Sequence, residues 1–240
     1  MISFKEKPAK LLLHACCGPC SMEPVRLLRE RGVEPHIYYA NSNIAPAEEY
    51  EHRRDTIVKW ANEKKLEFTE GEYTPEIWKQ AVANSKSREA RCRACYRMRF
   101  EESAAYAKKH GFDALGTTLS VSPYQYTQII REELERACRN EGIACLFEDY
   151  SPYYSEATRR SKEAGMYRQN YCGCLPSKAE ADKQRAQRKA EREAKKAARA
   201  KIRQTQEQEL QAKRQQRAEY DAKQARKRAI LKELRRNSNG

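Results

Sequence analysis

No phosphate-binding glycine loop is present in this sequence, which contains neither G-x-G-x-x-G nor G-x-x-x-x-G-K. Such loops bring backbone N–H groups close to phosphates, so these two nucleotide-binding signatures are excluded. Apolar runs approaching the roughly 20 residues that span a bilayer are also missing. Residues 1–8 lack the apolar core of a signal peptide. We therefore expect a cytoplasmic protein that does not associate with a membrane.

Net positive charge is nearly absent from residues 1–176, which contain 27 Lys and Arg against 25 Asp and Glu, a net +2. Residues 177–240 contain 21 against 9, a net +12, and together the two parts give the overall +14. Residues 177–236 contain neither Gly nor Pro and are rich in strong helix formers. We predict a folded domain over 1–176 and a long, solvated, basic helical extension over 177–240. A polycation of this kind favours a polyanion such as nucleic acid or an acidic membrane.

Short apolar or β-branched stretches alternate with helical ones over the first 170 residues. The predicted strands are 11–15, 34–40, 66–69, 112–119 and 144–147, and the predicted helices begin at 21 or cover 46–65, 75–82, 95–109, 125–139 and 156–164. Residues 85–93 are polar and are predicted to form a loop. This alternation is typical of an α/β fold in which helices cover both faces of a parallel sheet.

The stretch around Cys16 and Cys17 follows the first predicted strand. Ligands of open α/β sheets usually bind at the carboxyl ends of strands. Adjacent side chains of a regular strand point to opposite faces, so these two thiols can share a site only if the chain bends, and the following Gly-Pro pair supplies the bend. Ser21 is a good N-cap for the next helix, and a helix N-terminus favours the thiolate that binds metal. A metal or redox site is predicted here.

A second pair, Cys92 and Cys95, has the C-x-x-C spacing with which two thiolates reach one metal. Four thiolates suit tetrahedral zinc or an iron–sulfur cluster, and ligand type alone does not separate the two. Zinc ligands more often come as two C-x-x-C pairs, from which the adjacent pair Cys16 and Cys17 departs. The spacing leaves a structural zinc site and a cluster about equally supported.

The remaining cysteines have other predicted roles. A disulfide between Cys172 and Cys174 would close a small strained ring, and strained disulfides are oxidising and easily reduced. The alternatives for this pair are two further metal ligands or chance. Cys20 is either a spare ligand or a small residue of the first helical turn, and Cys138 and Cys145 are expected to be buried, inert thiols.

In combination, these motifs resemble the QueH-type, cobalamin-independent epoxyqueuosine reductases over roughly residues 10–177. The resemblance rests on His14-Ala15-Cys16-Cys17-Gly18-Pro19-Cys20-Ser21, Asn43-Ile44 with Pro46 and Arg53, Cys92-Arg93-Ala94-Cys95-Tyr96 with Arg97, Ser122-Pro123-Tyr124, and Tyr167-Arg168-Gln169-Asn170-Tyr171-Cys172-Gly173-Cys174. Ser42 stands where the family pattern has Pro, and the basic extension matches nothing in it.

The resemblance implies a Rossmann-like sheet similar to the adenine-nucleotide hydrolases, and an enzyme that reductively removes the epoxide oxygen of epoxyqueuosine at the tRNA wobble position. By this resemblance a 4Fe–4S cluster is held by Cys16, Cys17, Cys92 and Cys95, and Cys172 with Cys174 form a redox-active pair. An additional iron near Cys20 and an electron donor are further expectations. We predict substrate contacts from Asn43, Arg53, Tyr124 and Arg168, and tRNA backbone binding by the extension. For Tyr150, Tyr153 and Tyr154, stacking on the base and an ordinary place in the core are equally compatible with the sequence.

Two other functions are compatible with the residues. A zinc-stapled, tRNA-binding adaptor without catalysis would be colourless, whereas a cluster makes a protein brown. A sulfur-transfer enzyme acting on tRNA would carry sulfur on a cluster or on the pair at 172 and 174. It would need ATP to activate the base, and the missing phosphate loop counts against it.

Overall fold

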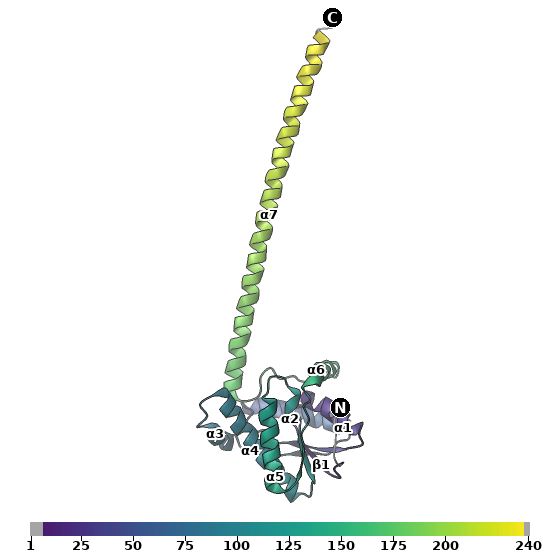
Figure 1. Ribbon diagram of the computed structural model, residues 1–240, viewed down its shortest axis with the longest axis vertical. Coiled ribbons are helices and arrows are strands. Elements are labelled where there is room, and N and C mark those ends of the chain that lie inside the picture. Colours follow the sequence, from purple (N-terminus) through teal and green to yellow (C-terminus); the bar gives the residue numbers. More distant parts are fainter. Residues whose placement is uncertain (1–6, 238–240) are drawn as a thin grey trace. The chain divides into compact units, whose positions relative to one another are not determined.

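A five-stranded parallel sheet forms the centre of the fold in the computed structural model, which describes residues 7–237 (Figure 1). Its strand order is β3-β2-β1-β4-β5. The strands are β1 (Leu11–His14), β2 (Pro35–Tyr39), β3 (Phe68–Glu70), β4 (Ala114–Thr117) and β5 (Ala144–Leu146). Every pairing is parallel, and Leu13 of the central strand lies opposite Ile37 on one side and Gly116 on the other. The predicted parallel α/β sheet is confirmed.

Alternate residues of the central strand face opposite layers of helices. Leu11 and Leu13 pack in one core with α1 (Gly18–Arg29) and α2 (Ala47–Glu63). Leu12 packs in a second core with α4 (Arg88–Lys109) and α5 (Thr127–Glu141). All three leucines are at most 1% exposed, and full burial of each side chain contributes about 1.5–3 kcal/mol. The sheet therefore has helices on both faces, as predicted. Because β1 is the middle strand, its carboxyl end lies midway along the edge at which the parallel strands end.

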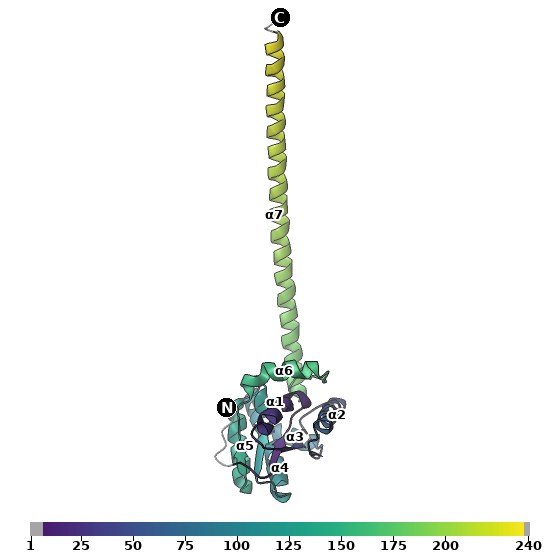
Figure 2. The ribbon, with the colours of Figure 1, turned by 90° about the vertical axis from the view of Figure 1, so that its right-hand side faces the viewer.

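Three further α-helices belong to the described chain, besides two short 3₁₀ helices, Leu119–Val121 and Ser151–Tyr153. The three α-helices are α3 (Pro75–Val82), α6 (Tyr154–Glu163) and α7 (Leu175–Asn237). Figure 2 shows α6 beside α1, with which it packs. The chain divides into a first compact unit that ends at Ala181 and a second that begins at Asp182. The predicted domain bounds, 1–176 and 177–240, stay a prediction. Within residues 7–237, no helix is both long enough and apolar enough to cross a bilayer.

Three helices begin earlier than the sequence predicts, and for α6 the difference is only two residues, since it begins at Tyr154 rather than at residue 156. Helix α1 begins at Gly18 and is preceded by Cys17 at the N-cap, because Pro19 suits the first helical turn. Ser21 is therefore inside the helix, where its hydroxyl donates to the Cys17 carbonyl oxygen over 2.8 Å. The predicted N-cap role of Ser21 is wrong.

The predicted loop over 85–93 is also wrong in its second half, because α4 begins at Arg88. Its N-cap is Ser87, whose hydroxyl oxygen accepts a hydrogen bond from the Ala90 N–H over 3.1 Å. A capping serine satisfies a backbone donor that the first turn leaves without a partner. Cys92 and Cys95 thus both lie within a helix, and the first helical turn ahead of them is polar and exposed.

Candidate functional site

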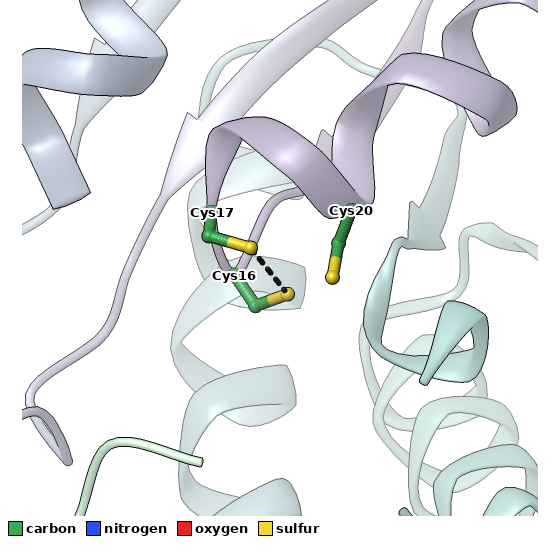
Figure 3. A group of neighbouring side chains, drawn as sticks. All are labelled: Cys16, Cys17 and Cys20. Atoms are coloured by element: carbon green, nitrogen blue, oxygen red, sulfur yellow. Dashed lines mark hydrogen bonds between the residues drawn. The ribbon is translucent and has the colours of Figure 1, made fainter. Parts of the chain in front are cut away.

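Three cysteine thiols meet where β1 passes into α1 (Figure 3). The Sγ atoms of Cys16, Cys17 and Cys20 all lie within 4.8 Å of one another, and those of Cys16 and Cys17 are 3.8 Å apart. A metal with sulfur ligands at about 2.3 Å in tetrahedral geometry keeps them about 3.8 Å apart. This cysteine triad therefore fits a thiolate-bound metal. The predicted bend is present, since the two adjacent side chains turn toward one site.

The protonation of the triad is uneven. Hydrogen bonds from the thiols of Cys16 and Cys20 hold the pKa of Cys17 well below its usual range, and the positive charge of Arg53 adds to this effect. The same hydrogen bond to Cys17 raises the pKa of Cys16 to about 11. Gln169 contributes a further donor, because its Nε2 lies 2.9 Å from the Cys17 Sγ. Cys17 is thus the most acidic thiol of the triad.

A second cysteine group combines the C-x-x-C pair of α4 with the C-x-C pair that precedes α7. Cys95 and Cys174 are buried against the indole of Trp78. Burial, with the nearby sulfur of Cys172 acting in the same direction, raises the pKa of Cys92 to about 12. Burial likewise raises the pKa of Cys95 to about 11. Thiols that oppose one another's ionisation in this way are suited to a cation, whose charge favours the thiolates.

The predicted cluster ligands fall into both groups. Cys16 and Cys17 belong to the triad, while Cys92 and Cys95 belong to the second group with Cys172 and Cys174. Arg53 lies close to both, since its positive charge lowers the pKa of Cys17 and acts in the same direction on Cys172. That the four ligands hold one cluster stays a prediction. So does the redox pair, whose two thiols are free in this structure.

The turn at Gly173 is held tightly against the loop that follows β2. Gly173 has φ +146°, and a Cβ there would lie 2.8 Å from Asn43 Nδ2 and 3.0 Å from Ile44 Cγ1. Its carbonyl oxygen accepts a hydrogen bond from the Ala45 N–H over 3.0 Å. Only glycine combines this backbone conformation with so close an approach. The spacing of Cys172 and Cys174 is thus set by a glycine that cannot be replaced without displacement.

Arg53 is a clamp on the same turn. Its side chain is 2% exposed and pairs with Glu49 at 2.7 Å. Its Nη1 donates to the Cys172 carbonyl oxygen over 2.9 Å, and its Nη2 donates to the Tyr171 carbonyl oxygen over 3.2 Å. A planar guanidinium has five N–H donors, so it can bind one carboxylate and two backbone carbonyl oxygens at the same time. All three nitrogens are thus engaged by the protein, which indicates a structural task, and the predicted substrate contact of Arg53 stays a prediction.

Sequence reasoning left Cys20 open between a spare ligand and a small residue, and it assigned no role to two other residues of the site, Arg99 and Gln169. Cys20 completes the triad, and the spacing of Cys17 and Cys20 is itself C-x-x-C, which could have been noticed. Arg99 follows Cys95 by four residues on α4, is 1% exposed, and its positive charge acts to lower the pKa of Cys95. Gln169 lies in the predicted motif, but its contact with Cys17 joins residues far apart in the chain.

The other predicted substrate residues differ in exposure. Asn43 is 2% exposed, and its buried Oδ1 has no hydrogen-bond partner among the described residues. Tyr124 is 65% exposed, and its ring makes an edge contact with that of Tyr154. Arg168 is partly buried, with Nη2 3.4 Å from the hydroxyl of Thr158. Substrate contact by these residues stays a prediction.

Two aromatic or basic side chains near the site belong to the core. Tyr150 is 1% exposed and packs with Leu27 and Val121, so its ring is not available for stacking on a base in this structure. His14 is fully buried, and burial together with the charge of Arg99 lowers its pKa to about 3. Its ring nitrogens lie 3.0 Å from the Thr117 hydroxyl and 3.3 Å from the Ala40 carbonyl oxygen. His14 is therefore a neutral residue that links neighbouring strands.

The family described as QueH, Epoxyqueuosine reductase QueH, matches residues 11–180. A protein of Dehalococcoides mccartyi named Epoxyqueuosine reductase QueH is 34% identical over 173 residues, which is 71% of this chain and 93% of the relative. A protein of the same name from Thermotoga maritima is 34% identical over 185 residues, which is 74% of this chain and 94% of the relative.

One solved structure is similar at a lower level. It is described as the crystal structure of predicted subunit of tRNA methyltransferase from Methanocaldococcus jannaschii DSM, and it is 12% identical over 63% of this chain and 76% of its own, with a TM-score of 0.44. Neither fold nor activity follows from a likeness at this level.

Proposed function

The chain belongs to the epoxyqueuosine reductase QueH family, and from that premise we propose that it reductively removes the epoxide oxygen of epoxyqueuosine in tRNA, which gives queuosine. The observation that carries the proposal is the gathering of seven cysteines into two groups beside one buried arginine, Arg53. The matched region, residues 11–180, contains all seven.

We propose that Cys16, Cys17, Cys92 and Cys95 hold a 4Fe–4S cluster. The gathering of three thiols in the triad and of buried thiols in the second group supplies the thiolate ligands that iron takes in such clusters. When bound, the cluster supplies one-electron transfer at the sheet edge. Cys20 is the third thiol of the triad and is free to hold an additional iron. A buried Arg99 beside Cys95 favours the anionic ligand form.

The proposed source of electrons at the substrate is the dithiol of Cys172 and Cys174. Oxidation of the two thiols to a disulfide releases two electrons and two protons. The epoxide loses both C–O bonds, a C=C bond forms between its carbons, and the oxygen leaves with the two protons as water. A reducing partner, either a dithiol or a one-electron carrier used twice, returns the disulfide to thiols before the next turnover.

The protein's own contacts hold this dithiol in place. Arg53 binds the carbonyl oxygens of Tyr171 and Cys172, and the Gly173 turn rests on Asn43. Both thiols are largely shielded, which keeps water and external oxidants from competing with the substrate. The exposed ring of Tyr124 is available to contact a nucleoside.

Anaerobic purification followed by incubation with epoxyqueuosine-containing tRNA and a chemical reductant tests the proposal. We expect a brown protein that converts the modified base to queuosine. Cys92→Ser should lose iron, Cys172→Ser should keep iron yet lose turnover, and Cys145→Ser, outside both groups, should lose neither. A colourless protein with bound zinc and no turnover would instead favour the tRNA-binding adaptor. A base that gains sulfur when ATP is added would favour the sulfur-transfer enzyme.

A further inference from the structure

Helix α7 carries a basic stripe between residues 188 and 199. The stripe consists of Arg188, Lys189, Arg192, Lys195, Lys196 and Arg199. At about 100° of rotation per residue, these six side chains fall within roughly one third of the helix circumference. The other six residues of this segment, four Ala and two Glu, occupy the remaining two thirds. A random placement of the same residues would spread the charge around the helix, so the sidedness is a distinct property of this segment.

The side opposite the stripe is unsuited to two common partners. It is built on alanines such as Ala190, Ala194 and Ala197, which are exposed. A helix that lies in a membrane surface needs Trp, Phe or Leu on its apolar face, and a coiled coil needs large apolar residues at heptad spacing. Alanine supplies little apolar area for either. The charged side is therefore the one that offers binding energy.

The stripe is available to a partner in solvent. Lys189 is 79% exposed, and its ion pair with Glu193 is long, at 4.0 Å. Just beyond the stripe, Arg203 is also 79% exposed and pairs with Glu207 at 3.6 Å. Exposed pairs of this kind contribute at most about 1 kcal/mol and are easily exchanged for a stronger anion. Phosphate groups can therefore replace these carboxylates.

The charge density of the stripe matches that of a nucleic-acid strand. Residues 188–199 rise about 17 Å along the helix axis at 1.5 Å per residue, which places one positive charge every 3 Å or so. A duplex strand carries one phosphate per roughly 3.4 Å. We propose that the basic stripe is a docking surface for the sugar–phosphate backbone of tRNA. The choice of tRNA among RNAs rests on the proposed function. The stripe lies outside residues 11–180, the part matched by the family.

Two full-length variants with equal loss of charge test the proposal. The stripe variant replaces Lys189, Arg192, Lys195 and Lys196 by Gln. The control variant replaces Lys183, Lys201, Lys223 and Arg226 by Gln; these also comprise three Lys and one Arg, but they lie on the other side of the helix. Gln is a strong helix former, so circular dichroism should show equal helix content. The probe is an unmodified tRNA transcript, whose binding is followed by fluorescence anisotropy between 50 and 300 mM salt.

We expect the stripe variant to bind tRNA about 10- to 100-fold more weakly at 150 mM salt, and to lower the slope of log affinity against log salt by about three. The control variant should change the slope by less than one. Equal losses in the two variants would overturn the proposal, because net charge alone would explain them. Unchanged binding in both, or binding to anionic-lipid vesicles in preference to tRNA, would also overturn it.

The assay separates this inference from the proposed function. It uses tRNA without epoxyqueuosine and needs neither turnover nor a bound cluster. A stripe-dependent affinity in a protein that fails to make queuosine would refute the reductase alone. Full reductase activity with both variants binding tRNA as wild type would refute the stripe alone.

Discussion

Replacement of Gly173 by alanine should damage the site through both backbone strain and steric clash. The backbone of Gly173 has φ +146°, a conformation that L-residues rarely adopt, and the cost of holding alanine there is about 1–3 kcal/mol. The added Cβ would also lie 2.8 Å from Asn43 Nδ2 and 3.0 Å from Ile44 Cγ1, so these two side chains or the turn itself must shift. We expect Gly173→Ala to lower the free energy of unfolding by about 2–4 kcal/mol in total.

A matched control variant separates the cost of backbone strain from the cost of the steric clash. Gly111 also has a positive φ, +71°, but a Cβ there would meet nothing within 4 Å. Gly111→Ala should therefore cost only about 1–2 kcal/mol, from backbone strain. Denaturant titration followed by tryptophan fluorescence suits this comparison, because both tryptophans, Trp60 and Trp78, belong to the first unit.

The turnover of the two variants completes the test. Displacement of the turn should move Cys172 and Cys174 relative to each other, so Gly173→Ala should also lose turnover, whereas Gly111→Ala should keep it. Equal stability of the two variants, or wild-type turnover by Gly173→Ala, would refute the reasoning that this turn sets the geometry of the dithiol.

Further predictions concern the buried carboxyl of Glu102, the contacts of Arg53 and the thiol of Cys20. Burial raises the pKa of Glu102 to about 7, so the folded state binds more protons than the unfolded state between pH 4.5 and 7, and its stability should fall as pH rises through that window. Glu102→Gln should therefore gain up to about 3 kcal/mol relative to wild type from pH 5 to pH 8; a constant difference would contradict this. Arg53→Lys should lose the clamp on Cys172 and at least tenfold of turnover, and unchanged turnover would show the clamp to be dispensable. Cys20→Ser should lower the metal content if the triad holds metal, and Cys138→Ser should leave it unchanged.

Local sequence was enough for most of the fold. Buried strands such as Leu11–His14 are short apolar runs bounded by turns, and their pattern survives without knowledge of their neighbours. The start of α4 was missed because residues 88–93 are polar, and polarity says nothing about helix or loop when the segment lies on the surface. Capping by Ser87 was the available indication.

By itself, the sequence determined the alternating α/β architecture, the spacing of the cysteine pairs and the concentration of charge in the last quarter of the chain. These depend on residue type and short-range spacing, which the sequence displays directly. Only the tertiary structure decided that Cys95 lies in one buried cluster with Cys174, and that Arg53 holds a turn rather than facing solvent. Such contacts join segments that are up to 119 residues apart. Which of many possible partners a thiol or a guanidinium meets depends on how strands and helices pack, and no local pattern encodes that choice.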